Sequence, residues 1–146
     1  PGLQASWKPH LCQRIKWDGG MARSTFDLRI EAAADVSFEW RDWSESQYFT
    51  GPQFRIQDGK LQAGGQTVEL PAGQWIHFDI AATPGKAGDD KWTMKVTLPG
   101  QPVKEFAGLA FGNPEFRKLT WMGFSSNANA ATVWYLDNFA VEGGTR

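Results

Sequence analysis

The sequence predicts an all-β protein, an antiparallel β-sandwich, and three observations support this class. Apolar and polar residues alternate with a period of two in many short runs, turn-forming residues separate these runs at regular intervals, and helical patterns are scarce. Strict alternation is typical of a strand with one buried and one solvated face. Many short strands of this kind in one chain pack as a sandwich or a barrel.

The first half of the chain carries the clearest strands. Residues 25–30 and 36–41 alternate without interruption, and a third run covers residues 54–57. The turn Asp58-Gly59 follows this third run, so it predicts a hairpin into a short segment around Leu61. Each of these strands has one face that is polar and therefore exposed to solvent.

The second half continues the pattern with longer connections. Pro71-Ala72-Gly73 forms a turn, and residues 82–90 form a loop rich in Gly, Pro and Asp. The strands expected in this half cover residues 68–70, 75–80, 91–98, 118–125 and 132–141.

Two segments could form short helical pieces, at residues 103–111 and 113–117. Gly108, Gly112 and Pro114 limit both, because Gly and Pro are the weakest helix formers. The fold class therefore stays all-β.

Length and composition exclude several classes of protein. The 146 residues fit one domain, residues 1–146, and because the chain opens with Pro1 we expect it to be part of a longer, multidomain polypeptide. A net charge of −1 without a basic run argues against nucleic-acid binding. Cys12 is the single cysteine, which excludes an internal disulfide. No apolar run approaches the roughly 20 residues of a membrane span.

Tryptophan is over-represented, with eight residues in this short chain. Alternation places Trp40 and Trp92 on the core side of their strands. Flat aromatic rings stack on the apolar C–H face of sugars, so a surplus of Trp favours glycan binding. The candidates for exposed platforms, with core packing as the alternative for each, are Trp43, Trp75 and Trp121. The pattern assigns no role to Trp7, Trp17 and Trp134.

Polar residues that suit a sugar lie on the face of the strands opposite the core. Arg41, Arg55 and His77 are the main ones, and if their strands are neighbours in one sheet they converge on a surface edged by Trp. The guanidinium fork suits carboxylates and sulfates, so an acidic or sulfated polysaccharide is a candidate ligand. The alternative is that the arginines pair with strand acids such as Glu39.

The run Trp40-Arg41-Asp42-Trp43, the segment Leu70-Pro71-Ala72-Gly73-Gln74-Trp75 and the ending Trp134-Tyr135-Leu136-Asp137-Asn138-Phe139 resemble concanavalin A-like (laminin G-like) jelly-roll domains. The resemblance spans residues 20–142. It implies a carbohydrate-binding module of the kind appended to secreted bacterial polysaccharide-degrading enzymes. The resemblance also implies that a catalytic domain lies in the same parent chain, and that the protein is secreted or lies at the cell surface.

The resemblance also implies a structural ion. In similar sandwiches an Asp at the position of Asp137 joins backbone carbonyls around Ca²⁺, which takes 6 to 8 oxygen ligands. The alternative for Asp137 is a strand-end carboxylate that accepts hydrogen bonds from loop amides.

Catalysis has weaker support in the sequence. Glycosidases need two carboxylates that face one bond, but the odd spacing of Glu39 and Asp42 sends their side chains to opposite faces of a strand. A lyase needs a base, for which His77 with Tyr48 or Tyr135 is a candidate.

We therefore predict a non-catalytic module that binds a polysaccharide. The expected stacking platforms are Trp43, Trp75 or Trp121, and the expected polar contacts are Arg41, Arg55 and His77. Two other classes stay open: a structural or protein-interaction domain, and a small polysaccharide lyase or hydrolase.

Overall fold

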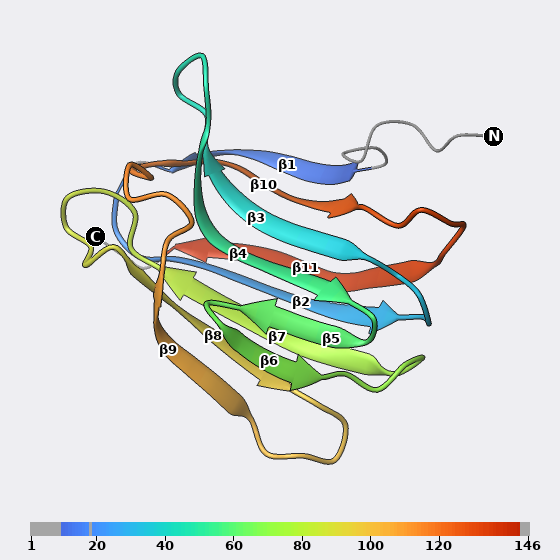
Figure 1. Cartoon of the computed structure of the whole chain (residues 1–146). Coiled ribbons are helices and arrows are strands. Elements are labelled where there is room, and N and C mark those ends of the chain that lie inside the picture. The colour runs from blue at the N-terminus through green and yellow to red at the C-terminus, as the bar shows by residue number, and fades with distance from the viewer. Residues whose placement is uncertain (1–9, 18, 144–146) are drawn as a thin grey trace.

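The computed structural model describes residues 10–17 and 19–143, and all regular secondary structure in these residues is β-strand. The strands form two antiparallel sheets that lie face to face as a sandwich (Figure 1). The predicted all-β antiparallel sandwich is therefore confirmed. The described residues contain no helix long and apolar enough to cross a membrane.

Six strands form the first sheet, called sheet A here. Their order across the sheet is β1-β10-β3-β4-β5-β6, so β1 and β6 are its edges. Strand β10 arrives from the far end of the chain and separates β1 from β3, a long-range crossover that local sequence patterns do not encode. The bounds are β1 His10–Trp17, β3 Val36–Asp42, β4 Phe49–Gln57, β5 Lys60–Ala63, β6 Gln66–Glu69 and β10 Leu119–Ser126.

Five strands form the second sheet, sheet B. Their order is β11-β2-β7-β8-β9, so β11 lies at the same side of the sandwich as β1 (Figure 1). The bounds are β2 Ala22–Ile30, β7 Trp75–Ala82, β8 Lys91–Thr97, β9 Lys104–Ala110 and β11 Trp134–Gly143.

Phenylalanine rings from both sheets form the centre of the core. Phe38 of sheet A lies 4.9 Å from Phe26 of sheet B between ring centroids, and Phe54 lies 5.2 Å from Phe78. Phe124 contacts the same group, at 4.8 Å from Phe38. Truncating one such ring to alanine typically costs about 3–5 kcal/mol. These rings fix the inner face of each strand and so determine which side chains point outward.

The tryptophans divide largely as alternation predicts. Trp40 and Trp92 are fully buried, which confirms their assignment to the core. Trp17 and Trp134 are partly buried and pack against the core. Trp7 lies outside the described residues.

Three segments differ from the sequence prediction. Residues 103–111 do not form a helical piece, because Lys104–Ala110 is the edge strand β9, bonded to β8. Gly108 has a φ of 69°, and Trp92 Nε1 donates to the Ala110 carbonyl at 2.9 Å, so a bulged strand is held there. Residues 113–117 form turns rather than a helix. Strand β1 was not predicted, since its side chains alternate only weakly in hydropathy.

Candidate functional site

The outer face of sheet A carries most of the predicted site residues. Along β3 the side chains of Glu39 and Arg41 point away from the core, which holds Trp40. Pairing of β10 with β3 sets Trp121 opposite Arg41 and Gly123 opposite Glu39. The antiparallel register therefore places an aromatic residue of one strand beside an arginine of its neighbour.

Arg41 is the centre of an aromatic stack on this face. Its guanidinium carbon lies 4.1 Å from the ring centroid of Trp121, 4.2 Å from Tyr48 and 5.8 Å from Trp43. Glu39 accepts a hydrogen bond from Arg41 Nε at 2.7 Å, which helps to hold the guanidinium near the rings. The ion pair with Glu39 is the alternative that the sequence left open, and it coexists with the aromatic contacts. We call Arg41, Trp43, Tyr48 and Trp121 the Arg41 stack.

Residues 43–48, which join β3 to β4, are held by a buried carboxylate. Asp42 is 4% exposed and accepts hydrogen bonds from the Ser44 amide and hydroxyl, at 3.2 and 2.6 Å. The amides of Arg117 and Lys118 also donate to it, at 3.3 and 3.0 Å. Figure 1 shows this β3–β4 connection projecting beyond the sheet. The carboxylate of Asp42 thus ties a projecting loop to the segment that precedes β10 and sets the position of Trp43.

Trp121 lies against the sheet rather than standing out from it. A Cβ placed at Gly123 would meet Trp121 Cη2 at 2.7 Å, so the indole covers the bare backbone of Gly123. Trp121 is 7% exposed, and the prediction of an open platform is wrong for this residue because Arg41 covers its ring. Trp43 is 48% exposed, and its ring centroid lies 5.2 Å from that of Tyr48.

Two hollows mark this outer face. One, of about 650 Å³, lies between β1, β10 and the projecting loop, and the residues that line it include His10, Cys12, Arg14, Trp43, Glu45 and Trp121. The other, of about 440 Å³, lies over β3, β4 and the β5–β6 turn, with Glu39, Gln53, Arg55, Gln62 and Thr67 among its lining residues. Both are open and mostly polar at their rims, as an extended, hydroxyl-rich ligand requires.

Arginines differ in their availability at these hollows. Arg55 makes a two-pronged ion pair with Asp35, at 2.8 and 2.7 Å, and this bonding raises the pKa of Arg55 above its ordinary value. Arg14 is exposed on β1, and among the described residues it has no ion-pair partner. The sequence pattern did not single out Arg14, because β1 itself was not predicted. Arg14 is therefore a cation of this face that is available to an anionic ligand.

Trp75 and His77 do not join this surface. Their strand β7 pairs with β2 and β8 in sheet B, so their side chains lie on the outer face of the opposite sheet. The condition on which the predicted convergence depended, that the strands carrying Arg41, Arg55 and His77 are neighbours in one sheet, is therefore not met. The physical reason is that alternation tells inside from outside but not which sheet a strand joins, a choice made by long-range pairing.

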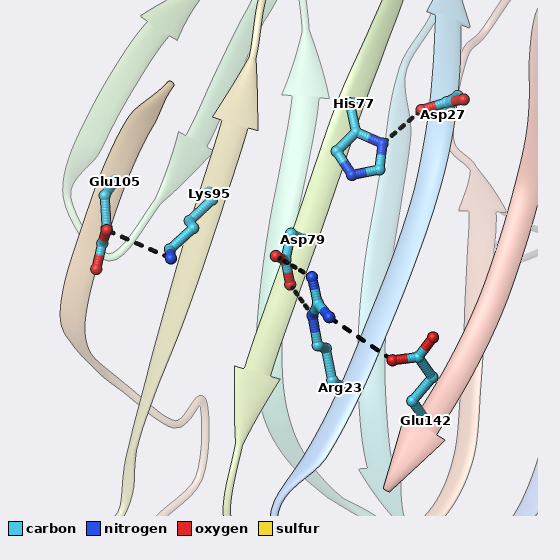
Figure 2. Close-up of polar contacts among 7 residues, drawn as sticks. All are labelled: Arg23, Asp27, His77, Asp79, Lys95, Glu105 and Glu142. Atoms are coloured by element: carbon cyan, nitrogen blue, oxygen red, sulfur yellow. Dashed lines mark hydrogen bonds and ion pairs between the residues drawn. The ribbon is translucent and has the colours of Figure 1, made fainter. Parts of the chain in front are cut away.

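The outer face of sheet B has its own polar network, shown in Figure 2. His77 Nδ1 lies 2.7 Å from Asp27 Oδ1, on the neighbouring strand β2. Arg23 donates two hydrogen bonds to Asp79, both at 2.8 Å, and this bonding lowers the pKa of the Asp79 carboxyl below its ordinary value. Lys95 and Glu105 pair further along the sheet.

Asp137, the predicted calcium ligand, lies on β11 of sheet B. Its Oδ1 accepts a hydrogen bond from the Asn138 amide at 2.7 Å. The nearest carboxylate in register is Asp27, and both of its oxygens are engaged, by His77 and by Asn138 Nδ2 at 2.6 Å. In the part of the chain that the structure describes, no three His, Cys, Asp or Glu side chains gather in a metal-binding arrangement. The Asp137 carboxylate thus accepts a backbone amide within its own strand, and the calcium site stays a prediction.

The two carboxylates considered for glycosidase chemistry do not face each other. Glu39 points outward while Asp42 is buried beneath the loop, as the odd spacing predicts, so the two carboxylates do not face one bond. His77 and Tyr48 lie on different sheets, so that pairing of a lyase base is not formed, whereas the alternative partner Tyr135 lies on the same outer face of sheet B as His77, one row away. Tyr48 instead contacts Arg41.

Comparison with solved structures identifies the fold. The chain superposes on the alginate lyase of the marine Aplysia kurodai with a TM-score of 0.61 and 12% identity, over 89% of this chain and 72% of that one. The endo-β-1,4-glucuronan lyase of the fungus Trichoderma reesei gives 0.59 and 14%, over 93% and 74%. Galectin LEC-6 of Caenorhabditis elegans gives 0.53 and 10%, over 97% and 93%.

These neighbours are jelly-roll sandwiches, and the chain has a concanavalin-like jelly-roll β-sandwich fold. No protein-family model matches the sequence, and no curated protein matches it.

Proposed function

We propose that this protein is a non-catalytic carbohydrate-binding module that binds an acidic polysaccharide on the outer face of sheet A. The observation that carries the proposal is the Arg41 stack at the edge of the 650 Å³ hollow, with the exposed Arg14 beside Trp121 on the neighbouring strand β1. Trp43 supplies a stacking face for the C–H side of a pyranose ring. Arg14 supplies a charge-assisted hydrogen bond for a carboxylate or sulfate.

The comparisons support a glycan ligand and an acidic one in particular. The two lyases among the structural neighbours are named for alginate and β-1,4-glucuronan, which are polymers of uronic acids. In this proposal Trp121 and Arg41 form the floor of the site rather than its platform. Arg55 contributes at the neighbouring hollow, where its pair with Asp35 holds the guanidinium in place.

The proposal includes the setting that the sequence resemblance implies. The module is linked to a catalytic domain in the same parent chain and is secreted or displayed at the cell surface. A structural Ca²⁺ at Asp137 would need backbone oxygens for most of its ligands. Thermal unfolding with and without a chelator tests whether calcium is bound. An unchanged Tm would contradict a structural Ca²⁺.

Calorimetry with alginate, polyglucuronate and a neutral glucan tests the main proposal. We expect the wild-type chain to bind at least one acidic polymer. Trp43→Ala and Arg14→Ala should each weaken this binding at least tenfold, while the matched control Trp75→Ala, on the other sheet, should leave it unchanged. A wild-type chain that binds neither of the two acidic polymers would contradict the proposal.

A polysaccharide lyase is the second candidate, and one contact favours it. The exposed Tyr48 lies against the Arg41 guanidinium, which is the pairing of a base with a cation that abstraction of a proton next to a uronate carboxylate requires. Proton removal would expel the glycosidic oxygen and leave an unsaturated sugar end. Release of unsaturated ends from alginate or polyglucuronate, lost in Tyr48→Phe, would establish this activity. No release after long incubation would leave the binding module as the function.

A further inference from the structure

The outer face of sheet B presents an aromatic pair that the site on sheet A does not use. Pairing of β11, β2 and β7 sets Tyr135, Arg29 and Trp75 side by side in one row across the sheet. Trp75 and Tyr135 are each 45% exposed, and their ring centroids are 6.4 Å apart. The Arg29 guanidinium lies 5.2 Å from the Tyr135 ring, so the row has an apolar surface with a polar centre.

The next row across the same strands is polar and ordered. His77 lies two residues beyond Trp75 on β7, on the same face and about 7 Å away along the strand. The Asp27 carboxylate holds it through Nδ1, and Asn138 in turn binds the other oxygen of Asp27. Figure 2 shows the second ring nitrogen, Nε2, on the side of the imidazole away from Asp27. An imidazole held in place by Asp27 therefore lies two residues along β7 from an exposed indole.

We propose that this surface, formed by Trp75, Tyr135, Arg29 and His77, is a second glycan-binding site that takes a neutral glycan. The Trp75 indole stacks on the C–H face of one sugar. His77 Nε2 and the Arg29 guanidinium bond hydroxyl groups at its edge. We call it the Trp75 surface.

Charge selects a neutral ligand over an acidic one. Arg29 is already paired with Glu31 at 3.0 Å, and the carboxylates of Asp27 and Asp137 lie beside the aromatic row. The Trp75 surface thus carries an excess of negative charge, which repels uronates and sulfates but not hydroxyl groups. This contrasts with sheet A, where Arg14 is the available charge.

The two sites point in opposite directions, since they lie on the outer faces of the two layers of one sandwich. One chain can therefore contact two polysaccharide strands of different charge at the same time. The Trp75 surface stands on its own observations and does not require that the site on sheet A binds a glycan.

Affinity electrophoresis in native gels tests the proposal, with a β-glucan, a mannan and a galactan as neutral probes and alginate as the acidic one. We expect at least one neutral polymer to retard the wild-type chain. The double substitution Trp75→Ala/Tyr135→Ala should weaken this retardation at least tenfold and leave retardation by alginate unchanged. Trp43→Ala, the matched control on sheet A, should show the reverse.

Because both aromatic residues are exposed, the double variant should keep the wild-type Tm, which confirms its fold. His77→Ala provides a second variant that spares the aromatic rings, and it should weaken neutral binding severalfold. Equal retardation of the wild-type chain and both variants would overturn the proposal, as would a wild-type chain that no neutral polymer retards. A wild-type chain that a neutral polymer retards and that neither alginate nor polyglucuronate retards would overturn the sheet A proposal and leave this one intact.

Discussion

Gly123 lies directly beneath the indole of Trp121, on the strand that pairs with both β1 and β3. A Cβ at position 123 would also approach the Leu11 carbonyl oxygen at 2.7 Å and Cys12 Cβ at 2.8 Å. The absence of a side chain here lets the indole lie flat, and the flat indole is what Arg41 stacks on. The floor of the proposed site therefore depends on a glycine.

Gly123→Ala should displace the Trp121 ring and disturb the Arg41 stack. Because backbone as well as side-chain atoms crowd the new methyl group, we expect a loss of about 1–3 kcal/mol in the free energy of unfolding. Near-ultraviolet circular dichroism should change with it, and affinity for acidic glycan should fall. Gly19→Ala is the control, since a Cβ there meets no atom within 4 Å. Equal stability of the two variants would contradict the account of Gly123.

Asp42→Ala should loosen the β3–β4 connection. It removes the acceptor of four hydrogen bonds and leaves the Arg117 and Lys118 amides without it, so we expect a loss of about 1–3 kcal/mol. Hydrogen exchange of residues 43–48 should become faster, and glycan affinity should fall because Trp43 is no longer held. The exposed Gln47→Ala, in the same loop but outside the lining of the hollow, serves as control. Unchanged exchange in Asp42→Ala would refute this anchoring role.

Asp79 should contribute to stability in a pH-dependent way. Hydrogen bonding from Arg23 lowers its pKa below the ordinary value of 3.8. The contribution of a carboxyl with a depressed folded-state pKa is complete above its unfolded pKa and is lost as pH falls through the folded one. Asp79→Asn should therefore cost about 1 kcal/mol at neutral pH and progressively less below about pH 4.

Urea unfolding at several pH values measures this dependence. Glu142→Gln is the control, because Glu142 is more exposed and lies 3.6 Å from Arg23. A stability difference between the wild-type chain and Asp79→Asn that persists undiminished at pH 2 would show that the ion pair is not its source.

Ser24 should tolerate the loss of its hydroxyl group. Its side-chain oxygen is fully buried on the inner face of sheet B and has no hydrogen-bond partner in the described part of the chain. An unpaired buried hydroxyl costs free energy, so Ser24→Ala should leave the Tm unchanged or raise it. Ser37→Ala, which removes the acceptor of a 2.8 Å bond from Asn127, should lower it. A marked fall in Tm for Ser24→Ala would reveal a partner for this hydroxyl.

Local alternation was sufficient to predict the inner and outer faces of the central strands. Trp40 and Arg41 emerge on opposite sides of β3 because the side-chain period of a strand is two. Alternation could not predict that β7 joins sheet B, since strand pairing depends on contacts distant in sequence. For this reason Trp75 and His77 were grouped with Arg41 but lie on the other face.

Two other physical causes kept further parts of the site out of the sequence prediction. Arg14 and Cys12 belong to β1, an edge strand whose burial is too slight to leave a clear apolar pattern. Alternation could not predict that Trp121 is buried, because an arginine on the outer face of the sheet covers its ring and the core does not. The nearest usable signal was Gly123, since a glycine inside a strand often marks a close approach of other atoms.

Protection of Cys12 from alkylation is the most direct test of glycan binding on sheet A. Cys12 is the only cysteine in the chain, it is exposed, and it lines the 650 Å³ hollow beside Trp121. Its rate of reaction with uncharged iodoacetamide should fall at least fivefold when an acidic oligosaccharide saturates the wild-type chain, and should not fall in Trp43→Ala at the same concentration. An unchanged rate at saturation would mean that the glycan binds elsewhere.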